Sequence, residues 1–547
     1  MVTINATFAR RFYMRKKFFS TAFWPLILSI VFTTGYFFGN FSPSKKELSL
    51  GNFPINKQSK LNQIIDYIDN EYVDSTDREQ LVDQTIENLL QKLDPHSYYI
   101  TASELQAMNE PLEGSFEGIG VQFSIQKDTV VVVTPISGGP SAEVGIAAGD
   151  RIINVDGELI AGTGIRNADV MRLLKGEGGT MVNLDVQRTG ADSLLPFEIT
   201  RGKIPIYSVD VGYMINDTIG YIKVSRFSRE TFNEFQDKYI GLLENGMTKL
   251  VLDLRGNGGG FMDAAINIVD QFLAEDQIIV YTEGRARKRK DYLASSEDDL
   301  MNVELAVLID ESSASASEIV AGAIQDNDRG VILGRRSFGK GLVQEQSSWP
   351  DGSATRLTIA RYYTPAGRCI QKPYDNGLKA YHKEVYDRYE NGEFESGDST
   401  SLTDSTIFKT TKGRTVYGGG GIMPDNFIPV DTAGASILLS RIFYSGNFYQ
   451  FAFDYADKNR EELVKFGNAE NFVTGFTYSG KVEKAFKAYL IAKKLKIVEQ
   501  DYKKSFDIIS ARVRAGIGRN IFGDEAFYPI LHEIDSALKE SISAKLN

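Results

Sequence analysis

The sequence predicts a mixed α/β (α+β) protein with an inserted strand-rich domain, an N-terminal transmembrane helix and a helical C-terminal extension. Strand and helix patterns alternate from 203 to 432, which is typical of an α/β layer. Residues 113–202 are dominated by short strand-like runs such as TVVVVTPI, and residues 433–547 have mostly helical patterns. A chain of 547 residues, 42% of them hydrophobic, is long enough for several domains with their own cores.

The N-terminus has the pattern of a membrane anchor. Residues 1–17 end in a basic cluster, and the next 27 residues, between Lys17 and Lys45, carry no charge. A transmembrane helix needs roughly 20 mostly apolar residues, and we place one at 18–39. The basic cluster predicts a cytoplasmic N-terminus, a single pass through the inner (cytoplasmic) membrane, and the rest of the chain in the periplasm or otherwise outside the cytoplasm. A cleaved signal peptide is the alternative. The length of the apolar run and the lack of a clear A-x-A site disfavour it.

Composition excludes several classes of function. The net charge of −11 argues against nucleic-acid binding, and the basic run at 285–290 is local, as in a solvated hairpin or loop. The one cysteine, Cys369, cannot form an intrachain disulfide. The histidines His96, His382 and His532 lie far apart and form no metal-binding motif, so no metal and no cofactor is expected.

Two further segments have distinct patterns. Residues 58–112 have apolar residues at helical spacing, with a break near Pro95. Residues 373–415 include an acidic, polar stretch at 390–405, which predicts an exposed or disordered insertion in the α/β layer.

The stretch GRRSFGKGLVQ (334–344) resembles a phosphate-binding loop but fails its last position. Gly341 stands where such a loop needs a serine or threonine for magnesium. The residues that follow are β-branched, aromatic and partly alternating, so strands are expected where a phosphate-binding loop would open a helix. Lys340 is therefore either a surface lysine in a glycine-rich turn or a residue that does chemistry without a nucleotide.

The segment DESSASASEIVAGAIQDNDRG (310–330) places serines between a buried strand and a helix. Backbone N–H groups at a helix N-terminus are unpaired and favour negative charge. This setting suits an acyl-transfer nucleophile, because an oxyanion forms beside it. A plain helix cap is the alternative interpretation.

The glycine-rich turn DLRGNGGG (253–260) also joins a strand to a helix and would let the backbone approach a ligand closely. It either supplies a second oxyanion donor or is only a tight turn. A serine nucleophile also needs a base, and burial can lower a lysine pKa toward ~7–8. Lys340 has few acidic neighbours in sequence, and it is the natural candidate.

The order DLRGNGGG, SSASASEIVAGAIQD, FGKGLVQ, YYTPAGRCIQ, GGGIMPD resembles the carboxy-terminal processing, or tail-specific, serine peptidases. The resemblance runs from about 94 to 429 and implies a peptidase core of the ClpP/crotonase-like type with a Ser–Lys dyad. It implies that Ser315 is the nucleophile, that Lys340 is the base and that Gln344 positions the lysine.

The same resemblance implies that backbone N–H groups bind the oxyanion. These donors would be Ala316 and Gly260, with Gly259 as the second choice within the glycine turn.

Residues 113–202 resemble the PDZ domain that this family carries. PDZ domains take a C-terminal peptide as an added strand and hold its carboxylate in a backbone nest. The resemblance assigns this loop and the start of the first strand to Gly118, Ile119, Gly120 and Val121. Relatives often have an arginine that couples the PDZ domain to the active site. Here Lys175 takes its place, keeping the charge but losing the planar fork.

These observations predict an endopeptidase that recognises accessible, apolar protein C-termini and needs no metal or cofactor. The alternative is a proteolytically inactive PDZ scaffold in the cell envelope, which the intact dyad and glycine turn disfavour. An enzyme related to acyl-CoA hydratases is disfavoured by the PDZ unit and the Ser–Lys pair. The membrane is an expected partner through 18–39, nucleic acid is not, and a homo-oligomer or an adaptor protein stays open.

Overall fold

A computed structural model describes the chain over residues 57–136, 138–297, 299–397 and 406–544. The chain divides into two compact units, with the boundary in the sequence between Gln84 and Thr85. In the first, the described part holds α2 (Lys57–Glu71) and the start of α3 (Arg78–Leu90). The predicted transmembrane segment at 18–39 lies outside the described residues. Among the residues described, no helix is both long and apolar enough to span a membrane.

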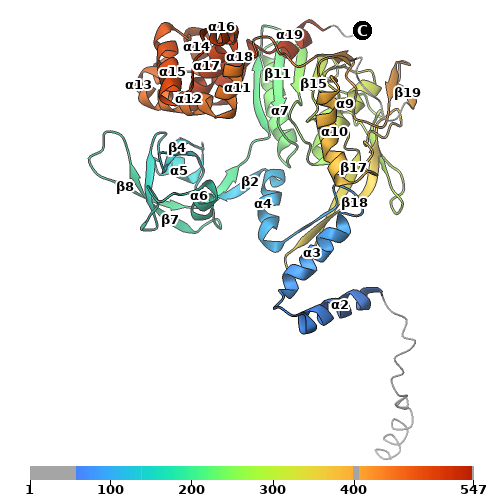
Figure 1. The fold of residues 1–547 in the computed structure, drawn as a ribbon. Coiled ribbons are helices and arrows are strands. Elements are labelled where there is room, and N and C mark those ends of the chain that lie inside the picture. Colours follow the sequence, from blue (N-terminus) through green and yellow to red (C-terminus); the bar gives the residue numbers. More distant parts are fainter. Residues whose placement is uncertain (1–56, 137, 298, 398–405, 545–547) are drawn as a thin grey trace, which may run out of the picture. The chain divides into compact units, whose positions relative to one another are not determined.

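The second unit is built on a six-stranded sheet in the order β10-β11-β12-β15-β16-β21 (Figure 1). Its neighbouring strands are parallel except for β10 and β11. The strands are β10 (Val209–Met214), β11 (Ile219–Val224), β12 (Lys249–Asp253), β15 (Glu304–Ile309), β16 (Val331–Gly334) and β21 (Asn426–Phe427). The strands expected before the glycine turn and before the serine segment are therefore confirmed as β12 and β15. Their continuous apolar runs reflect burial on both faces of the sheet.

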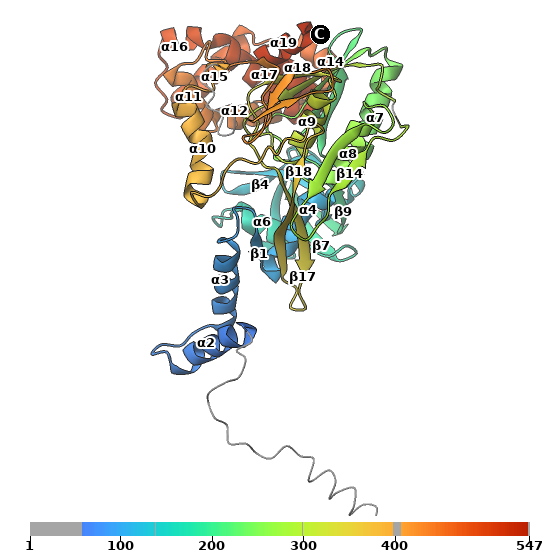
Figure 2. The same cartoon turned by 90° about the vertical axis from the view of Figure 1, so that its right-hand side faces the viewer.

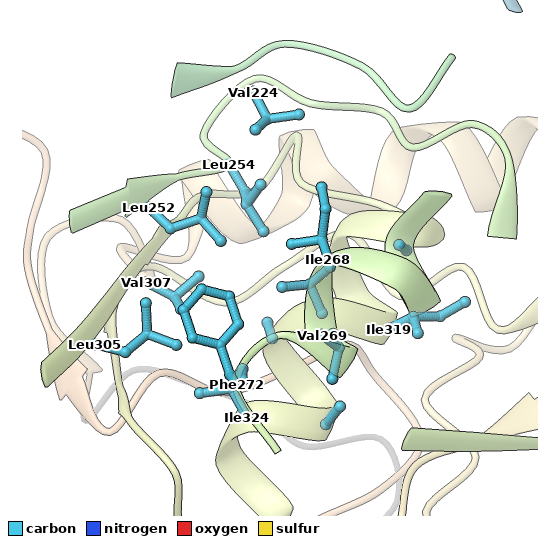
Figure 3. Close-up of a cluster of buried hydrophobic side chains, with 14 of the residues drawn as sticks. Val224, Leu252, Leu254, Ile268, Val269, Phe272, Leu305, Val307, Ile319 and Ile324 are labelled. Atoms are coloured by element: carbon cyan, nitrogen blue, oxygen red, sulfur yellow. The ribbon is translucent and has the colours of Figure 1, made fainter. Parts of the chain in front are cut away.

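Three helices cover one face of this sheet. They are α7 (Thr231–Glu244), α8 (Met262–Asp270) and α9 (Ala316–Asp326), and Figure 2 shows α7 beside α8. Leu252 and Val307 point from the strands toward Ile268 and Phe272 of this layer, in a cluster of fully buried apolar side chains (Figure 3). This packing fixes where α8 and α9 begin, and these are the helices that follow the glycine turn and the serine segment.

The opposite face is covered by the end of the helical extension. Val251, Leu308 and Leu333 alternate with the residues of the first face, and they pack with Ala537 and Leu538 of α19 (Ser536–Ser543). The part of the chain after 433 is thus not separate from the α/β core, because α19 packs on one face of its sheet.

The remaining helices of the extension pack around a second apolar core of their own. They are α11 (Ile437–Tyr444), α12 (Asn447–Lys458), α13 (Arg460–Leu463), η2 (Val464–Phe466), α14 (Ala469–Gly475), α15 (Gly480–Ala492), α16 (Glu499–Lys504), α17 (Phe506–Phe522) and α18 (Asp524–His532). Helix α18 packs beside β10, where Tyr528 donates a 2.6 Å hydrogen bond to Asp210.

A second sheet, β1-β18-β13-β14 with β17 paired to β18, lies beside the helical layer. Its strands are β1 (Tyr98–Ile100), β13 (Ile278–Glu283), β14 (Lys290–Leu293), β17 (Leu342–Ser348) and β18 (Ala354–Tyr363). The strands expected after Lys340 are confirmed, and the basic run at 285–290 connects the hairpin β13–β14. In the region predicted as helical at 58–112, β1 separates α3 from α4 (Ala102–Glu113), because the chain after Pro95 is extended.

The strand-rich unit forms a sheet of its own in the order β3-β4-β5-β7-β8, with β6 paired to β5. Its elements are β3 (Val121–Gln126), β4 (Thr129–Pro135), α5 (Pro140–Glu143), β5 (Arg151–Val155), β6 (Glu158–Leu159), α6 (Asn167–Leu174), β7 (Met181–Gln187) and β8 (Leu195–Thr200). Two short strands connect this unit to the rest of the chain. They are β2 (Ser115–Gly118) and β9 (Gly202–Pro205), and they pair with each other. Strand β3 lies at the edge of the sheet.

The prediction of an exposed or disordered stretch at 390–405 is wrong at one residue of its described part, since 390–397 is exposed or half-buried apart from Glu393. Glu393 is buried and forms a two-bond ion pair with Arg336 (2.6 and 2.7 Å), and residues 398–405 lie outside the description. Upstream in the same insertion, α10 (Leu378–Glu390) is attached through its buried residues Tyr381 and Arg388, and Arg388 donates to the carbonyls of Ser337 and Phe338. The polar composition of the insertion indicated exposure. It could not show that these residues bind partners that lie far away in the sequence. The short hairpin β19 (Ile407–Lys409) and β20 (Thr415–Tyr417) completes the insertion.

We expect Leu538→Ala to lower the free energy of unfolding by roughly 2–5 kcal/mol, because it leaves a cavity against the central sheet. Urea unfolding followed by circular dichroism would measure the change. The exposed neighbour Glu540→Ala is the control and should stay within about 0.5 kcal/mol of the wild type. Equal effects of the two substitutions would contradict a core role for α19.

Candidate active site

The serine segment is folded so that one serine faces a cavity and its neighbours do not. Ser313 donates to the carbonyl of Leu254 (2.8 Å), Ser317 donates to that of Asn257 (2.9 Å), and both side chains are fully buried. Ser315, between them, is only partly buried and lines a cavity of about 540 Å³. The two flanking serines therefore bind this segment to the glycine turn, and Ser315 alone is presented to a ligand.

The backbone at Ser315 is strained. Its φ of 56° and ψ of −113° fall outside the ordinary regions for a non-glycine residue. Such a conformation costs about 1–3 kcal/mol and persists only where the surroundings enforce it. Here the buried strand β15 and the buried helix α9 enforce it, because they hold both ends of a short connection.

The glycine turn lies directly against Ser315. A Cβ on Gly259 would be 2.7 Å from Cβ of Ser315, and a Cβ on Gly260 would be 2.0 Å from the carbonyl oxygen of Phe227. Both positions have positive φ, so glycine is required at each. The N–H of Gly259 donates to Oδ1 of Asn257 (2.9 Å).

Backbone donors remain at this place. In the part of the chain that the structure describes, the N–H groups of Gly260 and Ala316 have no hydrogen-bond acceptor, and the same holds for the neighbouring Gly258. Ala316 is the first residue of α9, where an N–H has no partner within the helix. Gly260 and Ala316 line the cavity beside Ser315.

The lysine segment closes another wall of the same cavity. Lys340 Nζ donates to Oε1 of Gln344 (3.0 Å), and Nε2 of Gln344 donates to the backbone carbonyl of His96. A carbonyl oxygen can only accept, so this contact fixes which end of the amide faces Lys340. A register shift in the β17–β18 ladder between Val343 and Gln344 turns the glutamine toward the lysine.

The environment of Lys340 favours the neutral amine. Burial is the largest effect and lowers the pKa of Lys340 from its ordinary value. The Glu318 carboxylate opposes this, and the Arg356 guanidinium adds to it. Arg356 is held in place by Tyr98 (2.7 Å) and Asn109 (2.9 Å).

Glu318 joins the serine and lysine segments, and sequence reasoning assigned it no role. Its two carboxylate oxygens accept hydrogen bonds from the backbone N–H of Ser315 (2.8 Å), Ser337 Oγ (2.5 Å), and the N–H groups of Gly339 (2.7 Å) and Lys340 (2.9 Å). Burial raises the pKa of Glu318, and these four bonds oppose the rise. The signal was present in the sequence, since Ser315-x-x-Glu318 is a capping-box pattern.

Two aromatic residues also reach this site. The buried hydroxyl of Tyr362 contacts the carbonyl oxygens of Ser315 (3.0 Å) and Lys340 (2.5 Å), forming a second connection between the two segments. His96 lies in the cavity wall, and Nε2 of its ring contacts the Tyr381 hydroxyl (2.8 Å). Burial lowers the pKa of His96 to about 4, so its ring is neutral near pH 7. No periodicity marks either residue in the sequence.

The rest of the cavity wall is mixed. The apolar side chains of Phe261, Met262 and Ile319 border the same space, and so do the charged Glu113 and Arg229. Within the described ranges, no group of three or more histidine, cysteine or acidic side chains is arranged to hold a metal ion.

The residues assigned to the PDZ loop connect β2 to β3. The carbonyls of Ile119 and Gly120 accept from Ser141 (3.0 Å) and Ile136 (2.9 Å), and Gly120 has a φ of 76°. In a planar trans peptide the N–H points opposite to the C=O, so the N–H groups of Gly120 and Val121 point away from the donors Ser141 and Ile136.

Lys175 lies at the border between the PDZ unit and α4. Its ammonium forms an ion pair with Glu110 of α4 and lies 4.6 Å from the ring centroid of Phe116. The neighbouring Asn109 of α4 is the residue that accepts from Arg356 in the cavity wall. A continuous set of contacts therefore runs from Lys175 to the surroundings of Lys340.

Comparisons with known proteins identify the family of the chain. Residues 218–379 match Peptidase family S41, residues 118–199 match the PDZ domain, and residues 438–523 match a family of unknown function (DUF8443). The chain belongs to the carboxy-terminal processing proteases of peptidase family S41.

Individual relatives carry that name. The chain is 37% identical over 321 residues to the carboxy-terminal-processing protease of Bartonella bacilliformis, covering 57% of this chain and 72% of the relative. It is 32% identical over 351 residues to the carboxy-terminal processing protease CtpA of Bacillus subtilis, with 64% and 74% covered. Among solved structures, the photosystem II D1 C-terminal processing protease is 32% identical with a TM-score of 0.34, covering 58% of this chain and 85% of that one.

We expect Glu318→Gln to reduce kcat/KM by about 10²-fold, because Ser315 and Lys340 lose their common support. An amide offers an NH₂ group to two of the four donors, which leaves them unsatisfied and lowers the free energy of unfolding by roughly 1–3 kcal/mol. Cleavage kinetics and urea unfolding would measure the two effects. Glu297→Gln, an exposed position, is the matched control, and wild-type kinetics in Glu318→Gln would contradict the role.

Proposed function

We propose that this protein is an endopeptidase that hydrolyses peptide bonds with a Ser315–Lys340 dyad and selects substrates by their C-termini. The observation that carries the proposal is the common cavity. One serine, one partly buried lysine and two backbone N–H groups without acceptors all line it. An acyl-transfer site needs these three components.

In the proposed mechanism, Ser315 Oγ attacks the scissile carbonyl carbon and its proton passes to the neutral amine of Lys340. The bond from Lys340 Nζ to Gln344 orients the amine, so that its lone pair is free for this proton. The resulting ammonium gives the proton to the leaving amine, and an ester to Ser315 remains. A water molecule then attacks the ester while Lys340 again accepts a proton. The bond to Ser315 Oγ breaks, Lys340 returns the proton to Oγ, and the acid product leaves.

The oxyanion of each tetrahedral intermediate would accept hydrogen bonds from Ala316 and Gly260. Gly259 is the weaker candidate, because its N–H already donates to Asn257. Pre-positioned donors of this kind stabilise the developing charge and typically contribute about 10²–10³-fold to the rate.

The PDZ unit would supply selection of the C-terminus. Strand β3 is at the sheet edge, so an extended tail can pair with it. The N–H groups of Gly120 and Val121 would hold the terminal carboxylate, and Lys175 would connect this event to α4 and the cavity wall.

We expect Ser315→Ala to reduce kcat/KM by about 10⁴-fold or more without unfolding the protein. Purified full-length protein would be incubated with an unfolded protein that ends in apolar residues and with the same protein ending in charged residues. Mass spectrometry would follow the fragments, and the wild type should cleave the apolar tail faster.

The adjacent Ser312→Ala, on an exposed side chain, is the control and should keep full activity. Cleavage by Ser315→Ala at the wild-type rate would refute the assignment. A wild-type protein that binds tails but cleaves none of them would instead support the inactive scaffold.

The pH dependence follows from the lowered pKa of Lys340. The base must be neutral, so kcat/KM should rise with pH and level off above the pKa of Lys340, which lies below the ordinary ~10.4. Initial rates between about pH 5 and 10 would locate this limb. Lys340→Arg keeps the charge at every accessible pH and should be inactive throughout, and activity in this variant would contradict the proposal.

A further inference from the structure

The helical extension contacts the PDZ unit through one face of α12. Phe453 is buried against Val131 and Val133 of β4. Asp457 forms an ion pair with Arg151 (3.2 Å) at the start of β5. Because positions four apart lie on one face of a helix, 449, 453 and 457 all face the PDZ unit.

This contact continues along the edge strand of the PDZ sheet. The amide of Gln450 donates to Oε1 of Gln126, the last residue of β3. Tyr449 precedes it and borders a cavity of about 500 Å³, together with Phe123, Ser124 and Ile125 of β3 and with Arg166 and Asn167 at the start of α6. Tyr449 is 51% exposed, so much of its ring is open to a ligand in this space.

We propose that Tyr449 is a specificity-determining residue that contacts the substrate tail upstream of its C-terminal residue. The inference rests on the proposed tail recognition. A tail whose carboxylate lies at Gly120 and Val121 runs antiparallel to β3, at about 3.3 Å per residue. The side chain about two to four residues before the C-terminal residue then reaches the space between β3, α6 and Tyr449.

The chemistry of this space favours a large apolar or aromatic side chain. Phe123 and Ile125 are partly buried apolar residues, and Tyr449 adds an aromatic surface with little conformational freedom to lose. Among the described residues that border this space the cation is Arg166, and it already has an acidic neighbour, Asp169, at 3.4 Å. A residue of the helical extension would thus complete a subsite that the PDZ unit alone leaves open on one side.

The test uses full-length protein carrying Ser315→Ala, which prevents cleavage, and fluorescent peptides with one apolar C-terminal residue. Phenylalanine or glycine would be placed in turn at the second, third and fourth residue before the end. We expect Tyr449→Ala to weaken binding about 3- to 10-fold for the phenylalanine peptide that reaches the site. Binding of the glycine peptides should not change, and Tyr449→Phe should bind as the wild type does.

Tyr444→Ala is the matched control, because Tyr444 is 88% exposed on α11 and does not border this space. With Ser315 restored, Tyr449→Ala should lower kcat/KM for the same tail only. Tyr449→Glu should shift the preference toward a lysine at that position, a gain that misfolding cannot produce.

The outcomes separate the two proposals. If tails bind and Tyr449→Ala changes none of them, or weakens all of them equally, the role of Tyr449 is refuted while tail recognition stands. A preference for acidic residues at the upstream position would also refute it. If no tail binds to any form of the protein, both proposals fail.

Discussion

The buried carboxylate of Glu318 is the interaction on which the arrangement of the site depends. A carboxylate is costly to bury, and this one is stabilised by four donors that come from the serine and lysine segments. Each donor satisfied in this way also fixes one atom of those segments. Ser315 and Lys340 are therefore held to each other through the backbone, and Tyr362 forms a second connection between them.

The second constraint is that the PDZ unit is held from two directions. Lys175 joins it to α4 and thereby to Arg356 in the cavity wall, and α12 of the helical extension joins it along β3 and β4. Both contacts combine charged pairs with apolar packing, so the position of the unit depends on several weak interactions together. An arginine in place of Lys175 would add a planar fork, which a single ammonium does not have.

Much of the fold follows from local pattern, and the central strands were predictable because burial on both faces requires continuous apolar runs. Ser315, Lys340 and the glycine turn were also identifiable, because each lies at a recognisable junction or motif. Contacts between residues distant in sequence could not be predicted in this way. The burial of Glu393 depends on Arg336, the fixed orientation of Gln344 depends on the carbonyl of His96, and the second face of the sheet depends on Leu538. No periodicity in the sequence encodes such pairings.

The side chain of Arg255 in the glycine turn shows that a contact between residues far apart in sequence can form only late in synthesis. Arg255 binds the buried Asp253 and also Asp535, with bonds of 2.7 and 3.1 Å to the latter, and Asp535 lies 280 residues further along the chain. A ribosome therefore synthesises Ser315 and Lys340 well before Asp535. During that interval the turn lacks one of its supports, and the sheet face that α19 later covers is still open. The growing polypeptide thus carries Ser315 and Lys340 before this part of the support of the cavity exists.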